Sequence, residues 1–262
     1  MNPYLNIAIK AVRQGARQLL QSMDRIDRLT ITEKAKHDFV STADKLSEFA
    51  IVEVLQKYYP DISIMSEETG MIDGSDPEYC WVLDPLDGTS NYLRQIPHFS
   101  ISLALLKHGE TLMAVVYDPV RDELFTAIKG SGAYFNSQRV RVSERQLSSS
   151  YIGLGGPKYH TPVHTDTYHA MAVALMANSL STRRLGSSAL DLCYLASGRI
   201  DGYWGVFLQE WDIAAASLIV REAGGLITNL SGKPYQKDDD GIIAASPKII
   251  HEIIELCGEC SA

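Results

Sequence analysis

Near residue 99 the hydrophobic pattern changes, and this change limits the folds that are open to the chain. From Phe99 to Val142 the apolar residues fall into short β-like runs, FSISLALL, TLMAVVYD, ELFTAI, GAYFN and RVRV. Turn-forming segments such as H-G-E, D-P-V-R-D and N-S-Q separate these runs. Strands joined by such short turns pair with their neighbours in sequence, so the segment predicts an antiparallel meander.

Helical periodicity precedes the meander. Apolar residues at helical spacing predict helices over residues 4–22 and 44–59. Short apolar runs predict strands at residues 61–65 and 81–83. Together with the meander, these elements form an α+β half, which we expect to span residues 1–147.

After the serine run at residues 148–150, strands and helices alternate. The predicted strands span residues 151–155, 199–206, 226–229 and 241–246. The predicted helices span residues 164–180, 187–196, 212–222 and 246–257. We therefore expect an α/β half over residues 148–262. Because no flexible linker separates the halves, we expect them to pack closely enough to count as one domain.

Composition restricts the classes of function. Acidic residues outnumber basic ones, 32 against 24, and no basic cluster stands out, so direct nucleic-acid binding is not expected. Lys10, Arg13 and Arg17 interrupt the apolar pattern of the first helix, which therefore does not read as a signal peptide. No apolar stretch reaches the ~20 residues of a membrane span. With four cysteines and no export signal, we expect reduced thiols and a cytoplasmic protein.

Two small clusters of potential metal ligands have plain explanations. Cys257 and Cys260 form one C-x-x-C near the C-terminus, without the second ligand pair of a zinc site or the strand–helix context of a redox motif. His160, His164 and His169 lie close in sequence, but their spacing matches no helical face well. We expect no function for the cysteines, and a solvated segment in place of a metal site for the histidines.

The most informative segment is W-V-L-D-P-L-D-G-T-S-N-Y at residues 81–92. Its first three residues predict a buried strand, which Pro85 ends by removing a backbone donor. Thr89 and Ser90 are predicted to cap a helix that runs to about Gln95. Two aspartates lie between the strand and the helix, where aspartate is also an ordinary turn former.

Carboxylates lie at several predicted element ends, and together they indicate a function more clearly than any one of them does alone. They belong to Asp44, Glu67, Glu68, Asp84, Asp87 and Asp212. Gathered at one centre, they would repel one another unless cations lay between them, and ligands that are all oxygen favour Mg²⁺. The free N–H groups of a helix that begins at Gly88-Thr89 would bind an anion. The pattern therefore predicts a phosphoryl-transfer site.

Five segments resemble the sequence of the inositol monophosphatase family. D-P-L-D-G-T-S-N-Y is similar to its first signature, and E-W-D-I-A-A-A with the downstream R-E-A-G-G is similar to its second. S-E-E-T-G, D-F-V-S-T-A-D-K and G-S-S-A-L-D-L-C-Y-L-A-S-G-R-I-D-G-Y also match. The motifs occur in order over essentially the whole chain, and the resemblance is closest to the bacterial extragenic-suppressor branch.

The resemblance implies a five-layered αβαβα sandwich, usually a homodimer, that uses two to three Mg²⁺ ions and is sensitive to lithium. On matching positions, the implied metal ligands are Glu67, Asp84, the carbonyl of Leu86, Asp87 and Asp212. Glu68 and Thr89 would orient a water for in-line attack on phosphorus, and Asp44 would act as a more distant base on the loop before the second helix.

For the substrate, the resemblance implies contacts with Asp87, Gly88, Thr89, Gly186, Ser187, Ser188 and Asp212. Family members that use inositol phosphates commonly have Glu directly after an aromatic pair, where it can bind a ring hydroxyl. Here Gly205 follows Tyr203 and Trp204. Since a buried polar anchor discriminates strongly among substrates, this departure argues against strict inositol specificity.

We therefore expect an enzyme that hydrolyses inositol 1-phosphate or a related small polyol or sugar phosphate. A nucleotide 3′-phosphate, fructose bisphosphate and histidinol phosphate stay open as alternatives. The D-x-D-G-T of haloacid-dehalogenase phosphatases is a poorer match, because Asp84 and Asp87 are three residues apart instead of two.

A function of a different class is also open. Bacterial relatives are implicated in ribosomal antitermination, and Arg183 and Arg184 lie in the region that the resemblance links to dimerisation and to the transcription machinery. The same two arginines are explained equally by an exposed basic pair near a site for an anionic substrate. Because every implied metal ligand is present, we expect any binding role to come in addition to catalysis.

Overall fold

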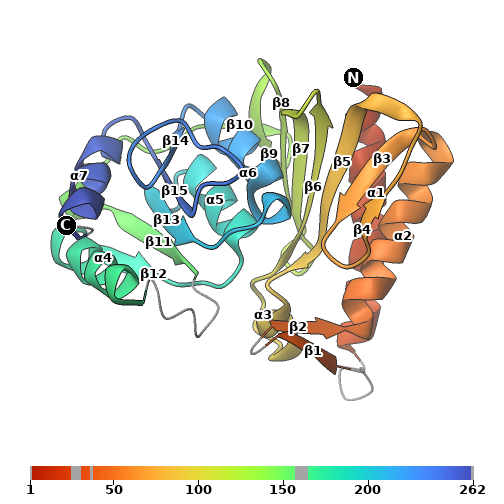
Figure 1. Cartoon of the computed structure of the whole chain (residues 1–262), viewed down its shortest axis with the longest axis horizontal. Coiled ribbons are helices and arrows are strands. Elements are labelled where there is room, and N and C mark those ends of the chain that lie inside the picture. The colour runs from red at the N-terminus through yellow and green to blue at the C-terminus, as the bar shows by residue number, and fades with distance from the viewer. Residues whose placement is uncertain (1, 25–30, 36–37, 157–164, 261–262) are drawn as a thin grey trace.

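Two sheets and three layers of helices alternate through the molecule (Figure 1). The computed structural model describes residues 2–24, 31–35, 38–156 and 165–260. The helices of the outer and middle layers are α1 (Pro3–Met23) with α2 (Thr42–Tyr58), α5 (Ser188–Ala196) with α6 (Glu210–Glu222), and α4 (Thr165–Asn178) with α7 (Ile250–Cys260). An eight-stranded sheet separates the first pair from the second, and a five-stranded sheet separates the second from the third (Figure 1). The predicted five-layered αβαβα sandwich is confirmed.

The eight-stranded sheet contains the predicted meander. Its strand order is β10-β9-β8-β7-β6-β5-β3-β4, and every neighbouring pair is antiparallel except β3 with β5. The strands are β3 (Ile62–Ser66), β4 (Gly70–Ile72), β5 (Asp76–Asp87), β6 (Ser100–Lys107), β7 (Glu110–Asp118), β8 (Glu123–Ile128), β9 (Gly132–Phe135) and β10 (Gln138–Val140). His108 and Gly109, both at positive φ, join β6 to β7 in the conformation that two-residue hairpins favour.

The five-stranded sheet is mixed. Its order is β12-β11-β13-β15-β14, in which β12, β11 and β13 pair parallel and β15 pairs antiparallel with both β13 and β14. The strands are β11 (Tyr151–Gly155), β12 (Ser181–Arg183), β13 (Gly202–Val206), β14 (Leu226–Asn229) and β15 (Gly241–Ala245). The three-residue β12 was not predicted, and neither was the hairpin of β1 (Ile31–Ala35) and β2 (Asp38–Ser41), because strands this short show too little alternation.

The middle helices join the two predicted halves. Val82 and Ala104 of the first sheet share a hydrophobic cluster with Ala189 of α5 and Ile219 of α6. Trp81 and Leu83 point to the other side of the same sheet, into the cluster that α1 and α2 cover. The described strands of the two sheets stay on either side of residue 147, but the halves share one core, and the domain boundary itself stays a prediction.

Pro85 does not end the strand, contrary to the prediction. β5 continues through it to Asp87, and a bulge against β6 lies between Asp84 and Asp87. A bulge leaves a residue out of the ladder, so the missing N–H of proline is tolerated there. In a regular strand, residues three apart face opposite sides, and the extra residue of the bulge brings both aspartates to the same side.

The predicted cap of the next helix is also wrong. Helix α3 (Thr89–Leu93) begins after Gly88, which has a φ of 98° and makes no side-chain capping hydrogen bond. The helix ends two residues before Gln95. Glycine is required at this N-cap because the left-handed conformation is costly for other residues.

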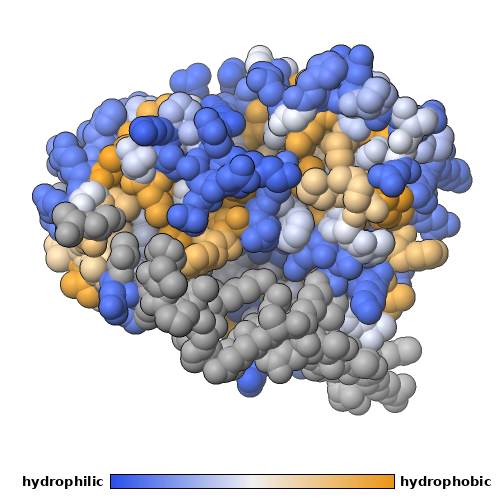
Figure 2. Space-filling model, viewed as in Figure 1, coloured by the Kyte–Doolittle hydropathy of each residue, from blue (hydrophilic) through white to orange (hydrophobic). Residues whose placement is uncertain are grey.

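Most of the surface seen in Figure 2 is hydrophilic, and apolar side chains show among others over α7 and α4 at the left of the view. Among the described residues, no helix has both the length and the apolar composition needed to cross a membrane.

Candidate active site

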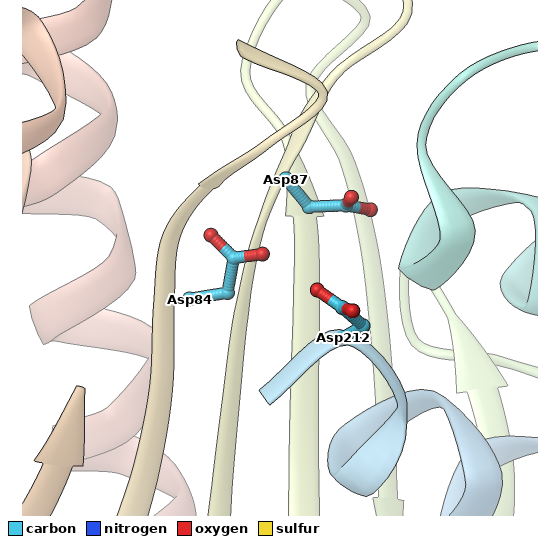
Figure 3. A group of neighbouring side chains, drawn as sticks. All are labelled: Asp84, Asp87 and Asp212. Carbon is cyan, nitrogen blue, oxygen red and sulfur yellow. The ribbon is translucent and has the colours of Figure 1, made fainter. Parts of the chain in front are cut away.

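Three carboxylates converge where the β5 bulge meets the first turn of α6 (Figure 3). Asp84, Asp87 and Asp212 each offer an oxygen within 4.8 Å of the others. One oxygen of each accepts a backbone N–H, from Leu86 to Asp84 (2.9 Å), from Ala189 to Asp87 (2.8 Å) and from Gln209 to Asp212 (2.7 Å). These hydrogen bonds fix the rotation of each carboxylate and hold all three at one point.

The cluster is electrostatically unfavourable without a counterion. Asp84 is 1% exposed, and burial raises its pKa well above the ordinary value. The negative charges of Glu67, Asp87 and Asp212 raise it further. Burial also raises the pKa of Asp87, although the hydrogen bonds from Ser187 and Ala189 oppose that shift.

The donor set fits Mg²⁺. All the converging ligand atoms are carboxylate oxygens, and the described residues add no histidine or cysteine to the cluster. Hard divalent cations select such ligands, and a bound cation would also remove the repulsion that raises the pKa of Asp84. The chain therefore offers a place for Mg²⁺ at Asp84, Asp87 and Asp212.

A cavity of about 420 Å³ opens beside the cluster. Besides the three aspartates, the predicted site residues that line it are Glu67, Leu86, Gly88, Thr89, Gly186, Ser187 and Ser188. Residues as far as 145 positions apart in sequence, Glu67 and Asp212, thus line the same cavity. Glu68 and Asp44, which were predicted to take part in catalysis, do not line this cavity.

Asp44 lies behind Thr89. It is 1% exposed in the first turn of α2, so its predicted place on the preceding loop is wrong. Its Oδ2 accepts the backbone N–H (2.9 Å) and the hydroxyl (2.6 Å) of Ser41, and its Oδ1 lies 3.1 Å from the Thr89 hydroxyl. Burial raises the pKa of Asp44, and these hydrogen bonds oppose the shift. The Thr89 hydroxyl also lies 3.1 Å from the Leu86 carbonyl, so it can donate its proton to either acceptor.

Asn91 ties the two halves together at the edge of the cavity. Its amide donates to the carbonyls of His98 and Leu185, both at 2.7 Å. Gly186, at a φ of 93°, passes so close that a Cβ there would lie 2.9 Å from the Asn91 amide nitrogen. A glycine is therefore required where the second half reaches the site.

The start of α5 is held against Asp87. The Ser187 hydroxyl donates to Asp87 at 2.6 Å, which leaves this serine engaged with the carboxylate. One turn further on, Asp191 pairs with His98 at 2.9 Å, and both are almost fully buried. Burial raises the pKa of Asp191 to about 6, and the hydrogen bond with His98 opposes this shift.

The sequence reasoning missed Asn91, the His98–Asp191 pair and Tyr203, whose hydroxyl donates to Ser188 at 2.9 Å. Asn91 is part of the first family-like signature and could have been found there. Asp191 and Tyr203 lie in the family-like segment that begins at Gly186 and could also have been found there, whereas His98 carries no local signal because its partner is 93 positions away.

The family of the chain follows from its similarity to known proteins. The family model described as "Inositol monophosphatase family" matches residues 1–261. The chain belongs to the inositol monophosphatase family. The resemblance seen in the sequence motifs is thereby confirmed over the whole chain.

Relatives in this family agree in sequence and in structure. The chain is 45% identical over 261 residues to Nus factor SuhB of Pasteurella multocida, covering 99% of this chain and 97% of the relative. Extragenic suppressor protein suhB from Bartonella henselae has a TM-score of 0.95 at 38% identity, with 98% of each chain covered. The Thermotoga maritima IMPase has a TM-score of 0.90 at 32% identity, covering 99% of this chain and 98% of that one.

The remaining candidate residues lie outside the carboxylate cluster. Arg183 and Arg184 are exposed, and their guanidinium groups lie over the rings of Tyr151 (4.8 Å) and Tyr168 (5.7 Å). Cys257 and Cys260 lie on α7, where Cys257 is buried. His160 and His164 lie outside the described residues.

Proposed function

We propose that this protein hydrolyses a small phosphomonoester with the help of two to three Mg²⁺ ions. The proposed ligands are the carboxylates of Glu67, Asp84, Asp87 and Asp212 and the carbonyl of Leu86. The observation that carries the proposal is the convergence of three carboxylates at one wall of a cavity, with the pKa of Asp84 raised by its buried surroundings and by its neighbours.

Mg²⁺ would neutralise the charge of the phosphate and lower the pKa of a bound water. The chain's own residues orient the reactants. The Thr89 hydroxyl lines the cavity and lies 3.1 Å from Asp44, so it can accept a hydrogen bond from a water while donating its own proton to Asp44. Glu68 does not line the cavity, and its predicted role in orienting the water stays a prediction.

On the substrate side, we propose that Ser188 and the backbone of Gly88 and Gly186 face the bound ester, since all three line the cavity. Ser187 holds Asp87, so its role in substrate binding is indirect. The proposed substrates are inositol 1-phosphate and related small phosphate esters, with sugar bisphosphates, nucleotide 3′-phosphates and histidinol phosphate as alternatives.

Phosphate release from a panel of these esters tests the proposal. We expect turnover at millimolar Mg²⁺, loss of turnover after chelation with EDTA, and inhibition by lithium. Mg²⁺ in excess of the chelator should restore activity. An inactive protein across the panel, at any Mg²⁺ concentration, would show that the site is not catalytic.

We further propose a homodimer and a cytoplasmic location. Val173 and Met176 of α4 and the nearby Leu180 are 65%, 62% and 59% exposed, and such a patch beside the edge strand β12 is suited to a second copy of the chain. Sedimentation velocity of wild type and of Met176→Glu would test this, with a monomeric wild type as the contrary result.

A second candidate function is supported by the relatives' name. Proteins called Nus factor SuhB are 38% to 45% identical to this chain. We therefore propose a contact with the transcription machinery in addition to catalysis, with Arg183 and Arg184 as candidate contacts. Pull-down of purified RNA polymerase and Nus factors by wild type and by Arg184→Ala tests it, and absence of binding by wild type would remove this role.

A further inference from the structure

Two glycines face each other on neighbouring strands behind the cavity. Gly155 of β11 and Gly205 of β13 are direct partners in the parallel ladder. A Cβ at Gly155 would lie 1.8 Å from the Tyr203 hydroxyl, and one at Gly205 would lie 2.7 Å from its ring. The fully buried phenol of Tyr203 therefore fills the space that side chains at both positions would need.

This packing explains the departure at Gly205 from the family pattern. A side chain at Gly205 would start toward Tyr203 and Leu208, the second of which lines the cavity. The chain has no side chain at this position, and the tyrosine occupies the route that one would take into the site. Tyr203 itself does not line the cavity, so it acts on substrates only through a neighbour.

That neighbour is Ser188. The Tyr203 hydroxyl donates to Ser188 Oγ at 2.9 Å, and Ser188 lines the cavity at the start of α5. Because Ser188 accepts this hydrogen bond, its own proton is directed to another acceptor. Burial raises the pKa of Tyr203 well above its ordinary value, so the phenol stays a neutral donor.

The surrounding wall is apolar. Residues 154–156 and 206–208, which we call the organic wall, contribute Leu154, Val206, Phe207 and Leu208 together with two glycines. The acidic lining residues all lie elsewhere in the sequence, at Glu67, Asp84, Asp87, Asp191 and Asp212. Asp191, the only one of these on α5, is already paired with His98.

A polyol presents many hydroxyl donors, which need acceptors such as carboxylates, and the organic wall supplies none among its side chains. We propose that Tyr203 and Ser188 set the selectivity of this site, favouring phosphate esters whose alcohol carries an apolar ring with hydrogen-bond acceptors over esters of a polyol. A nucleoside monophosphate has this chemistry, because its base has flat apolar faces and ring nitrogen acceptors. The inference rests on the proposed phosphatase function.

The test compares kcat/KM for adenosine 3′-monophosphate and inositol 1-phosphate. Wild type should prefer the nucleotide. Ser188→Ala and Tyr203→Phe should each reduce that preference by roughly three- to tenfold, the effect of one hydrogen bond, mainly through the KM of the nucleotide. Ser188→Thr, which keeps a hydroxyl, should preserve the ratio.

Tyr117→Phe is the matched control. The buried Tyr117 loses a hydrogen bond to Asp122 (2.7 Å) on the other side of the eight-stranded sheet, so the ratio should not change. If wild type prefers inositol 1-phosphate, the selectivity inference is wrong. It is also wrong if the Ser188 and Tyr203 variants lower kcat/KM equally for both substrates. In both cases the proposed phosphatase function is unaffected. If neither substrate is hydrolysed, the proposed function fails and the inference falls with it.

Discussion

The cavity has two walls that are built in different ways. The metal wall, formed by Glu67, Asp84, Asp87 and Asp212, is made of charges, and backbone N–H groups hold one oxygen of each of its three aspartates. The organic wall, residues 154–156 and 206–208, is made of apolar side chains and two glycines, of which Gly155 leaves room for Tyr203.

The difference explains why one wall can be recognised in the sequence and the other cannot. Charges at strand and helix ends are visible in the residues themselves, and their repulsion already implies a cation. A wall shaped by packing depends on which side chain fills which space. In a family that shares its chemistry, we therefore expect selectivity to change first at the organic wall.

The largest effect should come from removing the central charge of the metal wall. Asp84→Asn keeps the shape and can still accept the hydrogen bond from Leu86, but it removes a negative charge from the cluster. We expect kcat/KM to fall by at least about a thousandfold, which corresponds to roughly 4 kcal/mol of transition-state stabilisation. The melting temperature without metal should rise, because the buried repulsion is relieved.

Asp118→Asn is the control for this substitution. Asp118 is also buried and accepts two backbone N–H groups, but it pairs with Arg121 and does not line the cavity. We expect it to lower the melting temperature and to leave turnover in place. If Asp84→Asn behaved in the same way, the metal wall would be structural.

A second test concerns Mg²⁺ and pH. The raised pKa of Asp84 means that the folded metal-free protein binds this proton more tightly than the unfolded chain does. Its contribution to stability is therefore present at low pH and is lost as the pH rises above the ordinary aspartate value of about 4. Mg²⁺ binds only the deprotonated site, so the stabilisation that it gives should grow with pH.

At a hundredfold excess over its dissociation constant, Mg²⁺ should stabilise the protein by about 2.7 kcal/mol, or on the order of 5 °C in melting temperature. Thermal melts of wild type and Asp84→Asn, with and without Mg²⁺ between pH 5 and pH 8, measure this. A gain that is equal in both proteins would mean that the ion binds elsewhere.

The packing behind the organic wall, at Gly205, should respond to side-chain size. Gly205→Glu places a Cβ 2.7 Å from the Tyr203 ring, so we expect a loss of about 2 kcal/mol in the free energy of unfolding. Tyr203→Phe removes the hydroxyl, which lies 2.9 Å from that Cβ, and should restore part of the loss. Urea unfolding of the two single variants and of the double variant gives the coupling, and strict additivity would contradict the packing described above.

The smallest effect is expected at Asn91, which ties the two halves of the chain together at the edge of the cavity. Asn91→Ala leaves the carbonyls of His98 and Leu185 without their donor, which should cost about 1 kcal/mol or slightly more. Turnover should fall for every substrate alike, because these hydrogen bonds hold the second half of the chain against the first beside the cavity. Asn178→Ala, which removes one hydrogen bond at the exposed end of α4, is the control and should leave turnover unchanged.

Much of the fold could be predicted because its signals are local. The strands of the meander are short apolar runs separated by clear turn signals, so β6 to β10 were placed close to their observed bounds. The β5 bulge could not be predicted, since Pro85 normally ends a strand, and only the register against β6 reveals the extra residue. The three-residue β12 is likewise defined only by its partner β11.

The sequence by itself determined the family, the order of the longer elements and the set of acidic residues. Their types and spacing are enough because charge and hydrophobic periodicity are properties of the residues. The tertiary structure decided how Asp84 and Asp87 come to face the same side, and what stands in the place of the carboxylate that is absent at Gly205. Both depend on contacts between distant segments, the β5–β6 register and the packing of Tyr203 against Gly155, which leave no trace in the local pattern.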